Sequence, residues 1–352
     1  MATSSTTRRP VASSLPCLFL DYGDRQPATL YSVSDGARHP CDVDELRSSK
    51  RSWVTSHGWV LVWDPDTLTT FLWDPHAAPN DNNKITLPSL TNPPMRAGCT
   101  LSANPTDPNG YTVLLLDKSA SLMASFCISH RGPEFLETAL LMYYCHVSHP
   151  ASESEWVRHE YNVGSIPLPS NDSSTKRIIY RAASCHGKFY YLRKHGEIGV
   201  IEFSSTTGAP VFSTTPMKRV QLAPVGDYMA AASAYLVDLD GELYVAYIFF
   251  HNTDFHSIID VGVYRLDFDT KEPVRMDDIG DRAILLGSSC SLGGWCPATT
   301  FGLLPNTVYW MSLHDGLLHV YDLEQKTEEV REPCSGVAEP SRKPFWLLPK
   351  HP

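Results

Sequence analysis

Short apolar runs separated by glycine turns recur along the chain, and they constrain its fold more than any other feature. Runs rich in β-branched and aromatic residues are typical of strands; examples are Trp59–Trp63, Phe71–Trp73, Thr112–Leu116, Phe189–Leu192, Ile198–Phe203, Leu243–Phe250, Gly262–Phe268, Thr307–Ser312 and Leu317–Leu323. Turn dipeptides such as Asn109-Gly110 and Asp240-Gly241 lie between them, and Gly supplies the positive φ that tight hairpins need. Only Asp42–Ser49 predicts a short helix, with Asp42 as its N-cap. The pattern predicts an all-β chain.

Many of these runs are apolar on both faces, as in Val60–Trp63 and Leu243–Phe250. A sheet with one wet face would alternate apolar and polar residues, so these sheets must be covered by other sheets. A sandwich needs about 100 residues, and this chain has 352. Roughly two dozen strand candidates, at four strands a blade, predict a β-propeller of four-stranded antiparallel blades, about six of them, with seven as the alternative. The stretch Pro88–Pro108, rich in Pro, Asn and Thr, is expected to be a long connection.

The domain organisation follows from the two ends of the chain. Residues 1–15 are expected to be a disordered tail, and 16–352 one propeller domain. The tail is rich in Ser and Thr and carries Arg8 and Arg9, so an organellar transit peptide is the alternative interpretation. A propeller must close into a ring, and Cys17–Asp21 and Phe345–Leu348 are the strands expected to pair there.

Composition narrows the classes of partner and compartment. The formal net charge of -10 repels phosphate backbones and disfavours nucleic acid. Nine cysteines, an odd number with no Cys-x-x-Cys pair, predict buried reduced thiols in a cytoplasmic or nuclear protein rather than a disulfide scaffold. The longest apolar run, Leu243–Phe250, is far shorter than the roughly 20 residues of a membrane span, so no membrane association is expected.

A series of motifs carries a resemblance to a known family. In chain order they are Ser56–Val62, Phe71–Pro75, Lys84–Pro88, Ser184–Tyr190, Ala234–Ala246, Val263–Asp267, Ile279–Gly287 and Leu304–Tyr309. The last four, in this order, closely resemble the plant KIB-type β-propeller family, first described as a domain attached to F-box proteins. The resemblance covers the chain from about residue 16 to its end. The chain departs from the family pattern in one small respect, because Ile284 and Leu285 stand where the family has a Leu-Phe pair.

The resemblance implies a β-propeller and a function. In family members with a complete layout, an F-box helix bundle docks a ubiquitin-ligase adaptor and the propeller holds the substrate, in one branch a shaggy-like protein kinase. Here strand-like Leu18–Leu20 begins almost at once, where an F-box would need roughly 40 residues of amphipathic helix. Any link to a ubiquitin ligase is therefore expected to go through a separate adaptor.

Several clusters of reactive side chains have both a functional and an ordinary structural interpretation. Cys145, His146 and His149 could ligate zinc, but no second ligand pair has the required spacing. His251 and His256 could be ligands, and a solvated hairpin tip is the plainer interpretation. Asp281 and Arg282 could form a buried ion pair or orient a turn, and catalysis by them is not expected because no partnered acid or base is visible.

Other motifs are incomplete as functional signatures. Gly287–Ser291 lacks the second Gly and the helix of a hydrolase elbow, Asn80–Asn83 lacks the spacing of a calcium loop, and Asn171–Ser173 is a glycosylation triplet that matters only in a secreted chain. The tryptophans could form a ligand cage but are expected to be core wedges between blades; they are Trp53, Trp59, Trp63, Trp73, Trp310 and Trp346.

We therefore assign no catalytic, cofactor-binding or metal-ligating residue from the sequence. The function expected is that of a non-enzymatic protein-interaction propeller with a protein partner of unknown identity, a candidate ubiquitin-ligase component that recognises substrates. The alternative is an enzyme or small-molecule binder that uses the central channel, and a diverged family copy without a partner is a third interpretation. Carboxylates, a histidine and a group with a perturbed pKa that converge in the channel would favour an enzyme or small-molecule binder.

Overall fold

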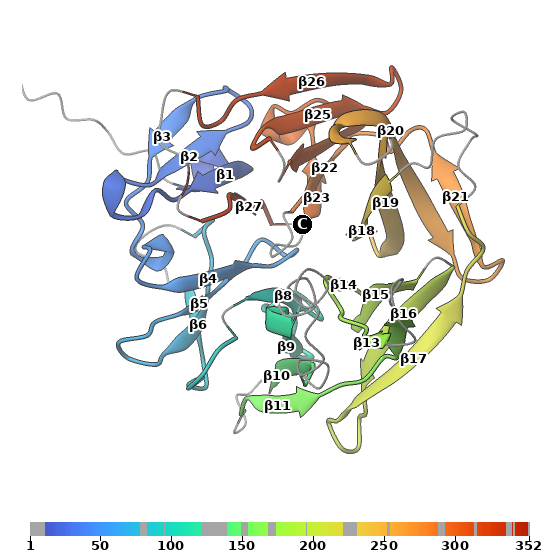
Figure 1. Cartoon of the computed structure of the whole chain (residues 1–352). Coiled ribbons are helices and arrows are strands. Elements are labelled where there is room, and N and C mark those ends of the chain that lie inside the picture. The colour runs from blue at the N-terminus through green and yellow to red at the C-terminus, as the bar shows by residue number, and fades with distance from the viewer. Residues whose placement is uncertain are drawn as a thin grey trace, which may run out of the picture.

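The computed structural model describes residues 11–77, 83–94, 96–120, 139–148, 154–167, 174–194, 196–220, 231–251, 254–287, 293–312, 315–335, 340 and 342–350. In these ranges the strands form six large sheets around a common centre, a β-propeller (Figure 1). The predicted fold class is confirmed, with six blades. No helix in the described ranges is long and apolar enough to cross a membrane.

We number the blades in chain order and give each from its innermost strand outward. Blade 1 is β27 (Phe345–Leu347), β1 (Cys17–Leu20), β2 (Thr29–Ser32) and β3 (Arg38–Pro40). Blade 2 is β4 (Arg51–Val54), β5 (Val60–Trp63), β6 (Thr70–Trp73) and β7 (Lys84–Leu87). Blade 3 is β8 (Ala97–Leu101), β9 (Tyr111–Asp117), β10 (Leu141–Val147) and β11 (Val157–Glu160).

The remaining blades follow in the second half of the chain. Blade 4 is β14 (Ala183–Cys185), β15 (Lys188–Lys194), β16 (Glu197–Phe203) and β17 (Pro210–Pro216). Blade 5 is β18 (Ala231–Leu239), β19 (Glu242–His251), β20 (Asp254–Asp267) and β21 (Glu272–Met276). Blade 6 is β23 (Gly294–Pro297), β22 (Arg282–Leu286), β24 (Thr307–Met311), β25 (Leu318–Asp322) and β26 (Thr327–Arg331). A separate pair is formed by β12 (Ser165–Pro167) and β13 (Ser174–Lys176).

The core lies between the blades, as the doubly apolar runs predict. The β5 and β6 strands are buried at every position, whereas outermost β26 is almost wholly exposed. Six apolar clusters each join two neighbouring blades around the ring. All six tryptophans expected as wedges are buried in these clusters; they are Trp53, Trp59, Trp63, Trp73, Trp310 and Trp346.

The ring closes with strands from both ends of the chain, as predicted. The innermost strand of blade 1 is β27, which pairs antiparallel with β1 so that Cys17 faces Leu347 and Phe19 faces Phe345. The buried indole of Trp346 donates a hydrogen bond to the Leu286 carbonyl of blade 6, at 2.9 Å. The ring is therefore closed by backbone pairing of the two chain ends inside blade 1, and a side-chain hydrogen bond crosses the seam between blades 1 and 6.

Blade 6 differs from the predicted four antiparallel strands. It has five strands, and β22 pairs parallel with β24, with Ala283 opposite Thr307. The extra strand is β23, which pairs antiparallel with β22 on its inner side. The predicted connection Pro88–Pro108 was also wrong in part, because it contains β8, which is buried along its whole length.

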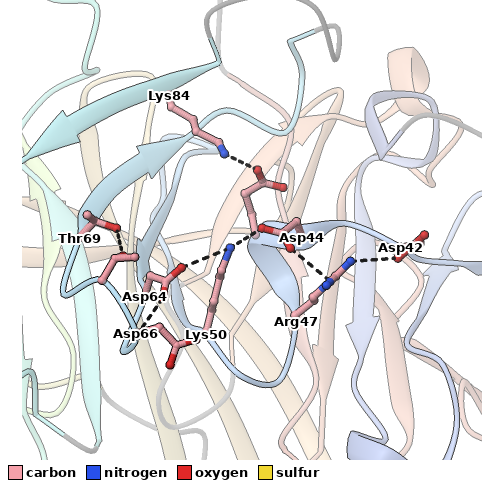
Figure 2. A network of polar contacts seen from close by, with 10 residues as sticks. Asp42, Asp44, Arg47, Lys50, Asp64, Asp66, Thr69 and Lys84 are labelled. Atoms are coloured by element: carbon pink, nitrogen blue, oxygen red, sulfur yellow. Dashed lines mark hydrogen bonds and ion pairs between the residues drawn. The ribbon is translucent and has the colours of Figure 1, made fainter.

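The predicted helix Asp42–Ser49 is only a 3-10 turn, η3 (Asp44–Leu46), and no side chain caps it. Ion pairs hold this segment instead (Figure 2). Asp44 contacts both Lys50 and Arg47, and Lys50 Nζ lies 3.6 Å from Asp64 of the β5–β6 turn. These contacts tie the link between blades 1 and 2 to blade 2, so tertiary partners override the local helical signal.

Three further 3-10 turns are η1 (Val11–Ser14), η2 (Gly23–Arg25) and η5 (Thr299–Phe301). Most of the expected tail, 1–15, lies outside the described residues. Its described part is η1 and the buried Leu15.

Candidate functional site

A cavity of about 240 Å³ lies among the innermost strands of blades 2, 4, 5 and 6. Its walls come from the β4–β5 turn, from β14, from the end of β18 with its turn into β19, and from the start of β23; the lining residues are Ser56, His57, Ala183, Ser184, Leu236, Val237, Asp238, Asp240, Gly241, Gly293, Gly294 and Trp295. Because β4 and β18 both end here, the cavity belongs to one end of the central channel.

His57 is the residue that links most blades at this site. It stands in the turn after β4, and its Nε2 lies 3.3 Å from Ser184 Oγ of blade 4. Desolvation lowers the pKa of His57 below its usual value, although a hydrogen bond to the Leu101 carbonyl of blade 3 and the charge of Asp238 in blade 5 act in the opposite direction. A neutral imidazole at neutral pH therefore links blades 2, 3 and 4, with the Asp238 carboxylate of blade 5 nearby.

Asp238 supplies negative charge to the cavity. Its Oδ1 accepts a hydrogen bond from the Gly241 backbone N–H at 2.9 Å, which closes the β18–β19 turn. Across the blade boundary, the Cys185 thiol lies 3.2 Å from the Gly241 carbonyl oxygen. Burial, and then the hydrogen bond and charge of Asp238, raise the pKa of Cys185 to about 12, so this thiol stays protonated and is a poor nucleophile.

Asp240 adds a second carboxylate, which is paired. Arg282 of blade 6 donates from Nε to Asp240 Oδ2 at 2.9 Å and from Nη1 to the Ile279 carbonyl at 2.8 Å. The Arg282 guanidinium carbon also lies 5.5 Å from the centre of the Trp295 ring. Blades 5 and 6 are thus joined by an ion pair at the edge of the cavity.

The cluster of His57, Ser184 and Asp238 has the residue types of a hydrolytic triad, but its geometry favours recognition. Ser184 lines the cavity but is only 3% exposed, so little of it is open to a substrate. The imidazole is held by the Leu101 carbonyl, whereas a triad needs a carboxylate to orient and stabilise the imidazolium. What the site can offer a ligand is a carboxylate, hydrogen bonds and an apolar wall.

The segment after β27 passes over the β4–β5 turn beside this site. The Lys350 backbone N–H donates to His76 Nε2 at 2.8 Å, its ammonium pairs with Asp74, and it lies 4.7 Å from the centre of the Trp59 ring. Burial alone would raise the pKa of Asp74, but hydrogen bonds from His76 and Lys350 lower it to about 2. The chain end is therefore held to blade 2 as well as to blade 1.

The candidate metal-ligating residues named from the sequence lie away from this cavity. Cys145 is buried in β10, and His146 lies 2.8 Å from Thr112 Oγ1 and 3.0 Å from the Gly208 carbonyl, while His149 is outside the described residues. His251 and His256 are exposed at the tip of the β19–β20 hairpin. Among the residues that the structure describes, no group of three or more His, Cys, Asp or Glu could hold a metal ion.

Asp281 orients a turn, which is one of the two structural roles expected, but it is exposed and does not form the expected buried ion pair with Arg282. Asp281 accepts hydrogen bonds from the backbone N–H and hydroxyl of Thr299 and so orients the turn after β23, whereas Arg282 pairs with Asp240. Ser288–Ser291, Asn171–Ser173 and Asn80–Asn82 lie outside the described residues. The six buried cysteines that the structure describes are free thiols, as expected.

The sequence interpretation missed the residues that converge on the cavity. A signal was present: His57, Ser184, Asp238 and Asp240 all lie in or next to the first turn of their blades, within motifs that carried the family resemblance. Each motif alone shows only a strand and a turn. Their convergence requires the order of blades around the ring.

A second cavity, of about 250 Å³, lies between blades 4 and 5. Apolar side chains such as Met217, Tyr247 and Phe249 line it together with basic ones. Two of these basic groups are paired within the chain, Lys194 with Glu197 and Lys218 with Glu272. The third basic residue of its wall is Arg219, so the charge of this cavity is opposite to that of the central one.

Three of the solved structures that match this chain are similar to it only at a low level. They are dihydro-heme d1 dehydrogenase NirN in complex with DHE (10% identity, 98% of this chain and 76% of that chain, TM-score 0.30), AofleA from Arthrobotrys oligospora (10%, 94% and 86%, 0.33) and streptogramin B lyase (10%, 92% and 94%, 0.24). At these TM-scores the similarities indicate no function. Comparison with curated proteins finds no match.

Comparison with protein families gives a specific result. The profile described as KIB1-4 beta-propeller matches residues 30–331, which runs from β2 to the end of β26. The match includes every motif on which the resemblance rests, and all four blades that line the central cavity. The chain belongs to the KIB1-4 beta-propeller family.

Proposed function

We propose that this propeller is a protein-interaction module without catalytic activity, and that its partner binds at the end of the channel where β4 and β18 finish. The observation that carries this proposal is the convergence of polar side chains from several blades on one cavity, with His57 and Asp238 at its centre. Membership of a β-propeller family supports a protein-interaction propeller in general. A closed ring holds its turns rigidly, which suits recognition because little conformational freedom is lost on binding.

The proposed partner is a protein rather than nucleic acid or a membrane, because the net charge of -10 repels phosphate groups. We further propose substrate recognition in ubiquitin-linked regulation, with a separate ligase adaptor, on the strength of the family resemblance. Six buried free thiols fit a reducing compartment such as the cytoplasm or nucleus.

Affinity purification of the tagged full chain, followed by quantitative mass spectrometry, tests the proposal. Asp269→Lys reverses a charge in the exposed β20–β21 turn, at the cavity end, and Asp66→Lys does so in the β5–β6 turn at the opposite end. We expect Asp269→Lys to reduce recovery of a defined partner several-fold and Asp66→Lys to leave it unchanged. Equal recovery with both variants, or no defined partner, contradicts the proposal. Ligase adaptor subunits among the recovered proteins support the ubiquitin-linked role.

The desolvated His57 beside Ser184 favours a second function, hydrolytic chemistry in the channel. Under the interaction proposal, Ser184→Ala leaves the rate of p-nitrophenyl acetate hydrolysis by the full chain unchanged. A rate that falls to the level of the buffer alone favours the second function instead.

A further inference from the structure

The central cavity is acidic. The ionisable residues that line it are His57, Asp238 and Asp240, and only Asp240 has a basic partner, Arg282. Asp238 accepts from the Gly241 N–H and lies near Cys185, and no lysine or arginine among the described residues forms an ion pair with it. Asp238 is half-buried, and a half-buried carboxylate without a paired cation attracts a cation more strongly than one in bulk water.

The size and walls of the cavity restrict the shape of that cation. At about 240 Å³ it is smaller than the roughly 300–1,000 Å³ pockets that hold drug-sized ligands. Leu236, Val237 and Trp295 provide an apolar wall beside the carboxylates. Lysine and arginine bury an aliphatic stem along such a surface and place the charge at its end, where a carboxylate can pair with it.

We propose that the central cavity accepts one lysine or arginine side chain of the protein partner, with Asp238 as the counter-charge and Trp295 as part of the wall. The inference rests on the proposed interaction function and names the chemistry by which the partner is recognised. His57 and Ser184 would shape the polar side of the pocket. The channel end then discriminates between partners by requiring a basic residue at one position.

The probe is N-acetyl-arginine amide, titrated into the full-length chain labelled with 5-fluorotryptophan and followed by fluorine NMR. The Trp295 resonance is assigned with Trp295→Phe. N-acetyl-citrulline amide, which has nearly the same shape without the charge, is the matched control ligand. We expect a saturable shift of the Trp295 resonance with the arginine probe and none with citrulline.

Asp238→Asn is the decisive variant, because an asparagine oxygen can still accept from the Gly241 N–H and so preserve the turn. We expect it to weaken binding of the arginine probe at least tenfold, whereas Asp66→Asn, far from the cavity, has no effect. No saturable shift, an equal response to citrulline, or equal affinity of the two variants overturns the inference. Recovery of a defined partner in the purification keeps the proposed function even then.

The purification completes the test when repeated with Asp238→Asn. Loss of a partner that the wild type and Asp66→Asn both retain supports insertion of a basic side chain. Retention of that partner, with the probe still bound by the wild type, overturns it and indicates a small-molecule site. Absence of any defined partner for the wild type removes the proposed function itself, whatever the probe does.

Discussion

His319 is a buried histidine held between two acidic side chains. It is 4% exposed, its Nδ1 contacts Glu328, and its Nε2 lies 3.2 Å from Asp315 Oδ2. Its ring stacks on Trp310, with 5.0 Å between the centres. Burial acts to lower the pKa of His319, but the hydrogen bond to Glu328 and the charge of Asp315 outweigh it and raise the pKa above its ordinary value.

This geometry predicts a pH-dependent contribution to stability. A raised folded-state pKa means that the stabilisation is fully present below the unfolded value of about 6.5 and is lost as pH rises through the folded value. The difference in unfolding free energy between the wild type and His319→Gln should therefore shrink between acidic and alkaline pH. Urea titrations across that range measure it, with His159→Gln on outer strand β11 as the control. A difference independent of pH contradicts the prediction.

At the scale of residues, the sequence predicts burial better than it predicts partnership. The six tryptophans expected as wedges, and six of the cysteines that the structure describes, are buried because size and apolarity decide their place. His57 contacts Ser184, 127 positions away in the chain, and nothing local marks that pair. Polar partnerships of this kind depend on which blades become neighbours.

Gly58 shows how one turn is matched to a distant element. Its φ of +76° suits glycine, and a Cβ there would lie 3.0 Å from the Pro349 carbonyl oxygen and 3.1 Å from that of Leu348. The segment that follows β27 therefore runs directly over the β4–β5 turn. Gly187, in the corresponding turn of blade 4, has the same φ of +76° but nothing within 4 Å of its Cβ position.

The two glycines make a matched pair for a prediction about this contact. Gly187→Ala should cost only the left-handed backbone strain, about 1–2 kcal/mol. Gly58→Ala should cost about 1–3 kcal/mol more, because backbone atoms of the final segment must also move. Urea unfolding of both variants measures the difference. Equal losses of stability would mean that the final segment does not press on the turn.

Among the elements, the strands with continuous β-branched and aromatic runs were predicted, whereas β8 and β23, which also contain glycine, were missed. The β8 strand includes Gly98, and β23 begins at Gly294, where a Cβ would lie 2.7 Å from Leu348. At Gly294 the absence of a side chain allows close packing, which a local strand propensity cannot reveal. The ion pairs of Asp44 likewise replaced the predicted helix Asp42–Ser49 with a single turn.

At the scale of the whole molecule, strand counting predicted about six blades, with seven as the alternative, and the need to close a ring predicted the pairing of the chain ends. Strand counting could not predict the parallel pair of β22 and β24, because the excursion through β23 leaves no periodic signal. The central cavity likewise depends on how the blades are arranged in the ring, since residues from 56 to 295 in the chain line it. Its candidate function is a property of the closed ring.

Ring closure can be tested at the seam between blades 6 and 1. Trp346 is 1% exposed and donates to the Leu286 carbonyl across that seam. Trp346→Ala should cost about 3–5 kcal/mol, and Trp346→Phe, which keeps the ring but loses the hydrogen bond, about 1–3 kcal/mol. Trp156→Ala is the control, since Trp156 is only partly buried and donates to the Pro88 carbonyl between blades 2 and 3.

The decisive measurement is how the loss of stability caused by Trp346→Ala is distributed around the ring. If closure makes the propeller one cooperative unit, Trp346→Ala lowers hydrogen-exchange protection in β9 of blade 3 as much as in β1 at the seam. Blade 3 lies across the ring from the seam (Figure 1). Protection lost only in blades 1 and 6 would show that the blades open independently, and a channel end assembled from four blades could then not be held rigid for recognition.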